Sequence, residues 1–118
     1  MRKIGPHARR SDCPIACTLD LIGDRWNLLI IRDLALGKQH FDELVESEEG
    51  IATNVLTKRL KYLCEVGLIK KVASEDDARR VCYSLTAAGE SLEGPLEAII
   101  DWGLENVPNT RLIPAMAR

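Results

Sequence analysis

Aromatic residues are scarce in this sequence, at 4% of 118 positions, so aliphatic side chains have to build the core. No apolar run approaches the ~18 residues of a membrane-spanning helix, and no apolar stretch follows the basic N-terminus as in a secretory signal. We therefore expect a cytoplasmic protein whose four cysteines are reduced thiols. The net charge of −2 excludes a uniformly basic chain that would coat any polyanion.

Signatures of catalysis and of metal binding are missing as well. The sequence has no Gly-rich phosphate loop, no Ser/His/Asp arrangement with a local signature and no HExxH motif, so we expect neither an enzyme nor a cofactor. The histidines, His7 and His40, lack ligand spacing, and Cys13 and Cys17 lack the paired CxxC units of a zinc site. We expect no metal site, and a small thiol-redox protein that uses these two cysteines is the remaining enzyme alternative.

The composition, with 46% hydrophobic and 29% charged residues, is that of one globular domain. We expect a polar arm over residues 1–12, a folded domain over 13–105 and a tail over 106–118. Segment 53–71 has five basic residues against one acidic residue, and a pair of arginines follows further along the chain. This segregation predicts one positive face on an acidic body, which favours a polyphosphate as the partner.

Hydrophobic periodicity, capping residues and glycine stops predict the order of the elements. The expected helices run from Pro14 to about Ile22, from Asp24 as N-cap to Gly37, over a short third stretch capped by Asp42, and from about Thr53 to Val66 before Gly67. Strands are expected over 68–73 and 80–85 around a polar loop. Thr86 caps a last helical stretch that Gly94 and Pro95 interrupt, with either a kink or a fresh start at Leu96. The side chains expected to face inward are Trp26, Leu29, Ile30 and Leu34 of the second helix and Val81, Tyr83 and Leu85 of the second strand.

The helix expected from Thr53 to Val66 has two distinct faces. At 100° per residue, an apolar stripe about 100° wide contains Leu56, Leu60, Leu63 and Cys64. The opposite side contains Asn54, Thr57, Lys58, Lys61 and Glu65. Such a helix fits the major groove of DNA, where asparagine can pair with adenine and lysine can reach guanine or a phosphate.

An ordinary amphipathic surface helix would show the same periodicity, so its neighbours in the chain have to decide. A short helix and a tight turn precede it and a basic hairpin follows, which is the order of a winged helix-turn-helix. We expect double-stranded DNA to be contacted by Thr53, Asn54, Thr57, Lys58 and Lys61, and by Arg79 and Arg80 of the hairpin. The alternative is a winged-helix module that binds another protein, and it would lack the steep salt dependence of DNA binding.

Short motifs occur in every expected element. They are Cys13-Pro14-Ile15, the run 18–26, Phe41-Asp42-Glu43-Leu44, the run 56–60, Gly67-Leu68, and Tyr83-Ser84-Leu85-Thr86 followed by Gly89, Leu92 and Trp102. Over about residues 13 to 104, these motifs resemble the HxlR-type transcriptional regulators, which are relatives of the MarR regulators. The resemblance implies a mainly α chain with a small β hairpin (α+β), folded as a winged helix-turn-helix domain with N- and C-terminal dimerisation helices. It also implies a homodimer that regulates transcription, most commonly by repression.

Two positions depart from the family pattern. Ala52 stands where the family commonly has a serine that caps the recognition helix, so Thr53 is the candidate cap. Glu48 occupies a position near the helix-turn-helix corner that is usually apolar, which predicts a looser or more exposed corner. Neither residue belongs to the face expected to meet the groove, so the DNA-binding interpretation does not depend on them.

The last helical stretch is more apolar than a single amphipathic helix needs. Its apolar residues are Leu92, Leu96, Ile99, Ile100 and Trp102, for which the sequence leaves core and subunit interface equally open. Trp26 lies on the apolar face of the second helix and is expected in the core. In a homodimer, two recognition helices related by a two-fold axis fit half-sites roughly 34 Å apart.

The cysteines have different expected environments. Cys64 shares the apolar stripe and should be buried, whereas Cys82 alternates with two inward-facing neighbours and should be partly exposed. Cys13 lies at the start of the first helix, where the helix dipole and nearby Arg9 and Arg10 favour a thiolate.

A thiolate at Cys13 would react with electrophiles and oxidants. The family resemblance agrees, since several members sense disulfide stress, aldehydes or quinones through the cysteine that matches Cys13, which makes a small electrophile or oxidant the candidate inducer. A purely structural cysteine is the alternative. A Cys13–Cys17 disulfide would require the first helical turn to unwind, because Cβ atoms four residues apart are ~5–6 Å apart against the ~4 Å that a disulfide needs.

Overall fold

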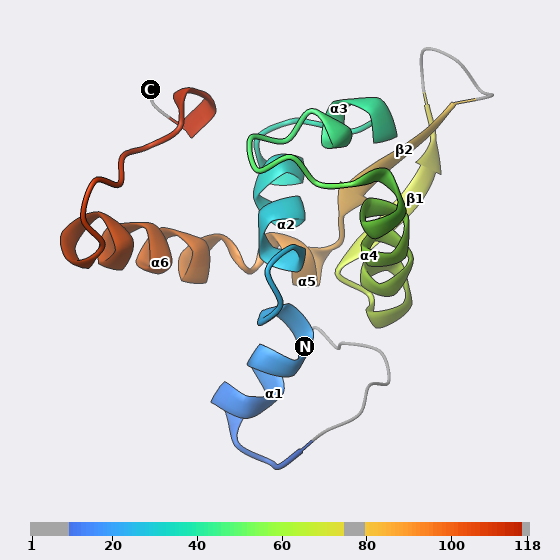
Figure 1. Ribbon diagram of the computed structural model, residues 1–118. Helices are drawn as coiled ribbons and strands as arrows, with labels where there is room; N and C mark the ends of the chain where they lie inside the picture. The colour runs from blue at the N-terminus through green and yellow to red at the C-terminus, as the bar shows by residue number, and fades with distance from the viewer. Residues whose placement is uncertain (1–9, 75–79, 117–118) are drawn as a thin grey trace.

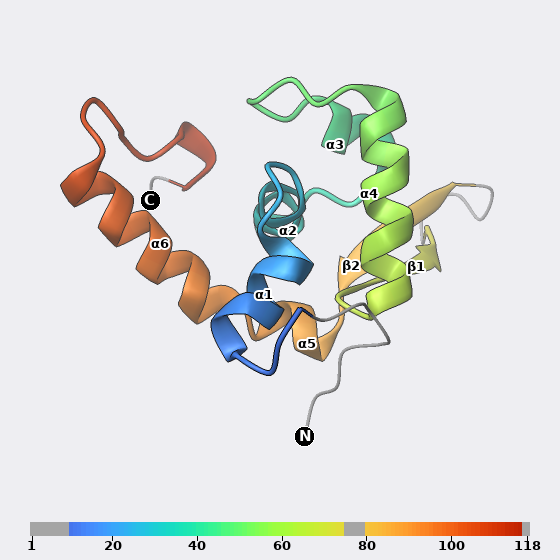
Figure 2. The same cartoon turned by 60° about the horizontal axis from the view of Figure 1, so that its bottom comes forward.

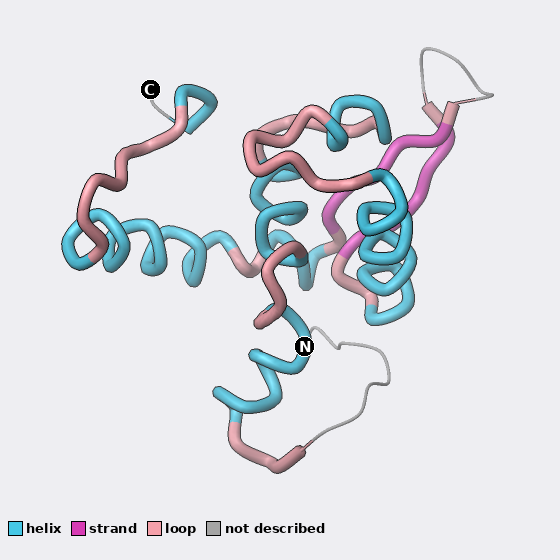
Figure 3. The backbone as a smooth tube through the Cα atoms, viewed as in Figure 1, coloured by secondary structure: helices cyan, strands magenta, loops and turns pink. Residues whose placement is uncertain are grey.

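The computed structural model of the chain describes residues 10–74 and 80–116. Along the chain the elements are α1 (Pro14–Ile22), α2 (Asn27–Ala35), α3 (Phe41–Val45), α4 (Thr53–Val66), β1 (Ile69–Ala73), β2 (Val81–Leu85), α5 (Ala87–Glu90), α6 (Glu93–Asn106) and a 3₁₀ turn over Pro114–Met116 (Figures 1 and 3). The two strands form an antiparallel hairpin beside α4. This arrangement confirms the expected winged helix-turn-helix, with α3 and α4 as the two helices of the motif.

The ends of α1 and α4 agree with the sequence expectation. Pro14 occupies the start of α1, where its missing N–H has no partner to lose. Gly67 ends α4 in the left-handed region at φ 88°, which glycine adopts without steric cost. The N–H of Leu68 then donates to the carbonyl oxygen of Leu63 at 3.0 Å, the hydrogen bond of a Schellman terminus.

Three other boundaries correct the prediction. Helix α3 begins after His40 and not at Asp42, because the Glu43 carboxylate accepts the N–H of His40 at 2.9 Å and fixes the start there. Helix α2 begins at Asn27, although Asp24 does accept the Asn27 N–H at 2.9 Å as a cap would. It ends at Ala35, before Gly37.

The C-terminal stretch breaks earlier than expected. Thr86 caps α5 by accepting the N–H of Gly89, as predicted. The chain then leaves the helix between α5 and α6, so Gly94 and Pro95 do not interrupt α6 but lie in its first turn. Proline is tolerated there because the first amides of a helix have no intrahelical acceptor.

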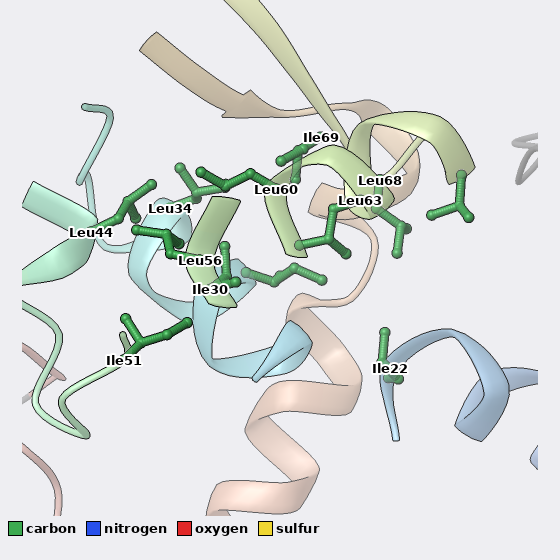
Figure 4. Close-up of a cluster of buried hydrophobic side chains, with 12 residues drawn as sticks. Ile22, Ile30, Leu34, Leu44, Ile51, Leu56, Leu60, Leu63, Leu68 and Ile69 are labelled. Atoms are coloured by element: carbon green, nitrogen blue, oxygen red, sulfur yellow. The ribbon is translucent and has the colours of Figure 1, made fainter. Parts of the chain in front are cut away.

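The core lies where α4 packs across α2. Leu56, Leu60 and Leu63 of α4 are at most 2% exposed, and Figure 4 shows them pointing toward Ile30 and Leu34 of α2. Burying one leucine contributes ~1.5–3 kcal/mol, so this stripe alone fixes the position of α4 firmly.

The inner face of α2 is wider than the sequence indicated. Ile31 is fully buried, whereas Leu29 is only half-buried and does not join the core cluster, so the expectation for Leu29 was wrong. The reason is tertiary, because α2 contacts both α1 and β2 and is covered on more than one side. Trp26 is half-buried and packs against the core, in agreement with its predicted placement.

The hairpin also corrects one prediction. Ile69 pairs with Leu85 and Ala73 pairs with Val81 across the strands. Cys82 is buried at 7% exposure, whereas Val81 is 40% exposed, the reverse of the expected pattern for these two residues.

The reason is a third backbone segment beside β2. His40 forms an isolated bridge with Cys82, and the N–H of Tyr83 donates to the carbonyl oxygen of Gln39 at 2.7 Å. Cys82 therefore lies on a central strand with backbone on both sides, which a two-stranded hairpin would not provide.

Two helices project from this core, as Figures 1 and 2 show for α1 and α6. The first residues of the C-terminal stretch, Leu92 and Leu96, pack against the core. Further along α6, Ile99 is 52% and Trp102 is 64% exposed, and α6 has no buried residue. The stretch therefore divides into a core-bound start and an uncovered apolar part. Within the described residues, no helix has the length and apolarity to cross a membrane.

Candidate nucleic-acid interface

The outer face of α4 is a polar strip backed by the core. Its exposed residues are Thr53, Asn54, Thr57, Lys58, Lys61 and Glu65. Because the leucines on the opposite side are fully buried, the helix cannot rotate and these side chains are held outward. The structure thus brings together all five α4 residues that the sequence assigned to the site.

Most of this strip has no side-chain partner among the residues that the structure describes. Lys58 and Lys61 form no ion pair with the part of the chain that the structure describes. Thr57 is different, since its hydroxyl donates to the carbonyl oxygen of Thr53 at 2.9 Å and keeps only acceptor capacity for a ligand. The two ammonium groups are consequently free to bind an external anion.

Arg59, one of the five basic residues of segment 53–71, has a structural role. Its guanidinium lies 3.3 Å from a carboxylate oxygen of Asp24 and 5.4 Å from the centre of the Tyr62 ring. These contacts attach α4 to the start of α2 and point Arg59 away from the strip. The charge pattern alone could not separate this residue from its neighbours.

The hairpin contributes cations of its own. Lys70 and Lys71 of β1 are exposed, and neither is among the site residues predicted from the sequence. The available signal was the pair of adjacent lysines in a strand expected to flank the recognition helix. Arg80 lies 3.2 Å from a carboxylate oxygen of Asp42 in α3, both side chains being well exposed. Arg79 lies outside the described residues.

The corner between α3 and α4 is tied to α2. The guanidinium of Arg32 donates to both carboxylate oxygens of Glu49, at 2.9 and 2.8 Å. This bidentate pair lowers the pKa of Glu49 from 4.5 to about 2 and raises that of Arg32. Glu48 is exposed as expected, but the corner is not loose, because its neighbour holds it.

The entry to α4 lacks a capping side chain. Ala52 is the N-cap residue and offers no hydrogen bond from its side chain. Thr53 is the first helical residue, so it does not replace the missing cap as the sequence had suggested. The residue just before, Ile51, is 5% exposed and anchors the chain in the core.

The candidate thiol at Cys13 is exposed at the start of α1. Its N–H donates to the Ser11 hydroxyl, and the Cys17 thiol donates to the Ser11 carbonyl oxygen at 3.1 Å. Arg10, expected to stabilise a Cys13 thiolate, instead pairs with Asp20 at 2.7 Å, and Arg9 lies outside the described residues.

The other thiols are less accessible. Cys64 is half-buried, and burial raises the pKa of its thiol although Lys71 acts in the opposite direction.

Over residues 10–74 and 80–116, no group of three His, Cys, Asp or Glu side chains is placed to hold a metal ion.

Comparisons with known proteins agree with the helix-turn-helix geometry of α3 and α4. The family model described as HxlR-like helix-turn-helix matches residues 21–111. The chain is 37% identical over 100 residues to Rv3095 of Mycobacterium tuberculosis, an uncharacterized HTH-type transcriptional regulator, covering 85% of this chain and 63% of that protein. The chain thus spans less than two thirds of the length of its mycobacterial relatives.

Solved structures show the same fold. The crystal structure of PA1607, a candidate transcription factor, superposes with a TM-score of 0.79 at 37% identity, over 88% of this chain and 73% of PA1607. The reduced form of the transcriptional regulator YodB from Bacillus subtilis gives a TM-score of 0.70 at 27% identity, over 86% of this chain and all of that one. These matches confirm the resemblance drawn from the motifs: the chain belongs to the HxlR-like helix-turn-helix family.

Proposed function

We propose that this protein is a transcriptional regulator that binds a specific sequence of double-stranded DNA as a homodimer and acts by repression. The observation that supports this most is the outer face of α4, where Asn54 and two lysines without an ion pair to any described residue are displayed over a rigid core. Helices of this kind enter the major groove, where Asn54 can bond to adenine and Lys58 or Lys61 can bond to guanine or a phosphate. Thr53 and Thr57 add hydroxyl groups on the same face.

The hairpin extends the proposed contact beyond α4. The exposed Lys70 and Lys71 would reach the flanking backbone, and Arg79 is assigned there from the sequence alone. Arg80 would contact DNA only by exchanging its exposed ion pair with Asp42 for a phosphate. Such an exchange costs little, because an exposed ion pair contributes about 0–1 kcal/mol.

A second copy of the chain is the proposed partner of the projecting helices. Ile15 and Leu19 of α1 and Ile99 and Trp102 of α6 are all more than half exposed. Large apolar side chains in this number along two projecting helices are typical of subunit interfaces. Pairing through them would duplicate α4 about a two-fold axis, as a symmetric operator requires.

The proposed inducer is an electrophile or oxidant that modifies Cys13. Support comes from the exposure of this thiol at the N-terminus of α1 and from YodB, which has also been solved after diamide treatment and with quinone bound. Because α1 belongs to the proposed dimer interface, an adduct at Cys13 would change the separation of the two recognition helices.

Salt titration tests the DNA-binding proposal. Double-stranded DNA selected by the protein from a random-sequence pool should bind with log Kd rising linearly with log salt, by about 0.9 per phosphate contact. Lys58→Gln and Lys61→Gln should each weaken binding and reduce this slope by up to about 0.9 for each lysine that contacts a phosphate. Arg111→Gln, which removes an exposed cation beyond α6, is the control and should leave the affinity and the salt slope unchanged. A flat salt dependence would favour the protein-binding alternative.

The redox proposal has its own test. Treatment with mild peroxide or a quinone should modify Cys13, as seen by mass spectrometry, and change the affinity for the selected DNA. Cys13→Ser should abolish this response, and Cys82→Ser, at a buried thiol, should retain it. An unmodified Cys13 with unchanged affinity would leave Cys13 a structural residue.

A further inference from the structure

The first turn of α4 has to be held in place without a capping side chain. Ala52 provides none, and Thr53 and Asn54 project from this turn into solvent. The first amides of a helix lack intrahelical acceptors, so an uncapped first turn frays readily. Two of the proposed DNA contacts are nevertheless in this turn, and their direction depends on it.

The chain that enters α4 is bound to α2 instead. Both carboxylate oxygens of Glu49 accept from Arg32, and one of them also accepts the hydroxyl of Ser47 at 3.0 Å. Arg32 donates to the Ser47 hydroxyl oxygen as well, at 3.3 Å. Gly50, at φ 69°, then turns the chain, and its N–H donates to the carbonyl oxygen of Ser47 at 3.0 Å. The α3–α4 turn is thereby closed on itself and attached to one guanidinium.

The guanidinium is itself fixed. Arg32 donates to one oxygen of Asp33 at 3.0 and 2.9 Å, and Asp33 is only 3% exposed. The Arg32 side chain is 12% exposed and that of Glu49 is 35% exposed. A planar guanidinium held on two sides is preorganised for a bidentate carboxylate, which an ammonium group could not match.

We propose that Arg32 and Glu49 are positioning residues for DNA recognition: their ion pair sets the first turn of α4 in place of an N-cap side chain. The inference rests on the proposed DNA binding. Neither residue needs to touch DNA, because both act through the turn that leads into Ala52. Freeing the turn lowers the population of the binding-competent arrangement, and the apparent Kd rises by the inverse of that population.

The direction of the effect distinguishes positioning from general electrostatics. Glu49→Gln removes one negative charge, which by long-range attraction alone would tighten the binding of a polyanion. The positioning role predicts the opposite, a Kd raised by about tenfold if about one tenth of the molecules keep the competent turn. The slope of log Kd against log salt should stay at the wild-type value, because no phosphate contact is lost.

A set of matched variants carries the test, with DNA selected by the wild-type protein as the probe. Glu48→Gln removes the same charge one residue away from the pair and should not weaken binding. Arg32→Lys keeps the charge but loses the planar guanidinium that donates to both oxygens of Glu49, and it should weaken binding in the same way as Glu49→Gln. Ala52→Ser in the Glu49→Gln background supplies the missing cap and should recover most of the lost affinity. Circular dichroism and a melting curve establish that each variant is folded at the assay temperature.

Each outcome is informative. Wild-type affinity in folded Glu49→Gln and Arg32→Lys, or a reduced salt slope, would overturn the positioning role. So would a Glu49→Gln defect that Ala52→Ser does not relieve. If Glu49→Gln is unfolded, Arg32→Lys and its rescue by Ala52→Ser in the Arg32→Lys background decide the question. Failure of the wild-type protein to select any DNA would instead reject the proposed function itself.

Discussion

The hydroxyl of Thr86 donates a 2.6 Å hydrogen bond to the carbonyl oxygen of Gly67 and accepts the N–H of Gly89 at 3.2 Å. One side chain thus joins the left-handed end of α4 to the start of α5. The N–H of Thr86 also donates to the carbonyl oxygen of Leu68 at 3.1 Å. The C-terminal end of α4 is therefore fixed by a segment that follows the hairpin.

Replacing this hydroxyl should destabilise the domain. Thr86→Val keeps the shape of the side chain but leaves the Gly67 carbonyl and the Gly89 amide without their partner, at a cost of about 1–3 kcal/mol. Thr86→Ser keeps the hydroxyl and should cost less than about 1 kcal/mol. Urea denaturation of the two variants measures the difference. Equal stability of valine and serine at this position would show that the two hydrogen bonds contribute nothing net.

A second prediction concerns Gly89, over which the backbone of Leu68 passes closely. A Cβ at Gly89 would collide with the Leu68 carbonyl oxygen, a backbone atom that cannot rotate aside. We expect Gly89→Ala to destabilise the domain by about 3 kcal/mol or more. Gly103→Ala is the matched control, because its Cβ meets nothing within 4 Å and lies inside α6, where alanine gains up to ~1 kcal/mol. Thermal unfolding of both should show shifts of opposite sign.

The ion pair of Glu49 predicts a specific pH dependence of stability. Its pKa is lowered from 4.5 to about 2, so the pair's full contribution is present above about pH 4.5 and is lost as the pH falls toward 2. With allowance for partial exposure, wild type should exceed Glu49→Gln by about 1–2 kcal/mol at neutral pH. Denaturation at pH 7, 4.5, 3 and 2 should show this difference shrinking only across the last three points. A difference that is constant with pH would exclude the charge as its origin.

The exposed apolar part of α6 gives a prediction about assembly that rests on the proposed homodimer. Trp102→Gln and Ile99→Gln remove large side chains that are 64% and 52% exposed. They should weaken self-association by at least tenfold each if these residues are central to the interface. Analytical ultracentrifugation measures the change, with Asp101→Asn as the control on the same helix. Unaltered association in both glutamine variants would exclude this part of α6 from the interface.

Thiol labelling should separate two cysteines by their surroundings. Cys13 is exposed, whereas Cys82 is 7% exposed and hydrogen-bonded on a central strand. Iodoacetamide should modify Cys13 in the native protein and Cys82 only when the domain opens. Mass spectrometry over a urea series follows both sites. Rapid native labelling of Cys82 would mean that the segment around Gln39 and His40 does not cover β2 as described.

Local signals were sufficient for most of the helices. The stripe of Leu56, Leu60 and Leu63 and the stop at Gly67 predicted α4 from end to end, because periodicity and a left-handed terminus are properties of adjacent residues. The same stripe predicted which residues of α4 face outward. Prediction failed where a distant segment decides, as at Cys82, which the segment around His40 covers although Tyr83 and Leu85 pack against the core as the alternation of the strand predicts.

The candidate site divides in the same way. Its members on α4 follow from the sequence, since one buried face determines the exposed one. The sequence does not show that Arg59 is paired within the protein, unlike Lys58 and Lys61, because its partner Asp24 is 35 residues away in the chain. The same is true of Glu49, whose partner Arg32 is 17 residues away.

The sequence by itself determined the family, the order of the elements and the polar face of α4, because each depends on the spacing of residues within single elements. Only the tertiary structure decided which cations are free, which thiol is buried and what holds the entry to α4. These properties depend on pairs of side chains that meet only after the helices have packed.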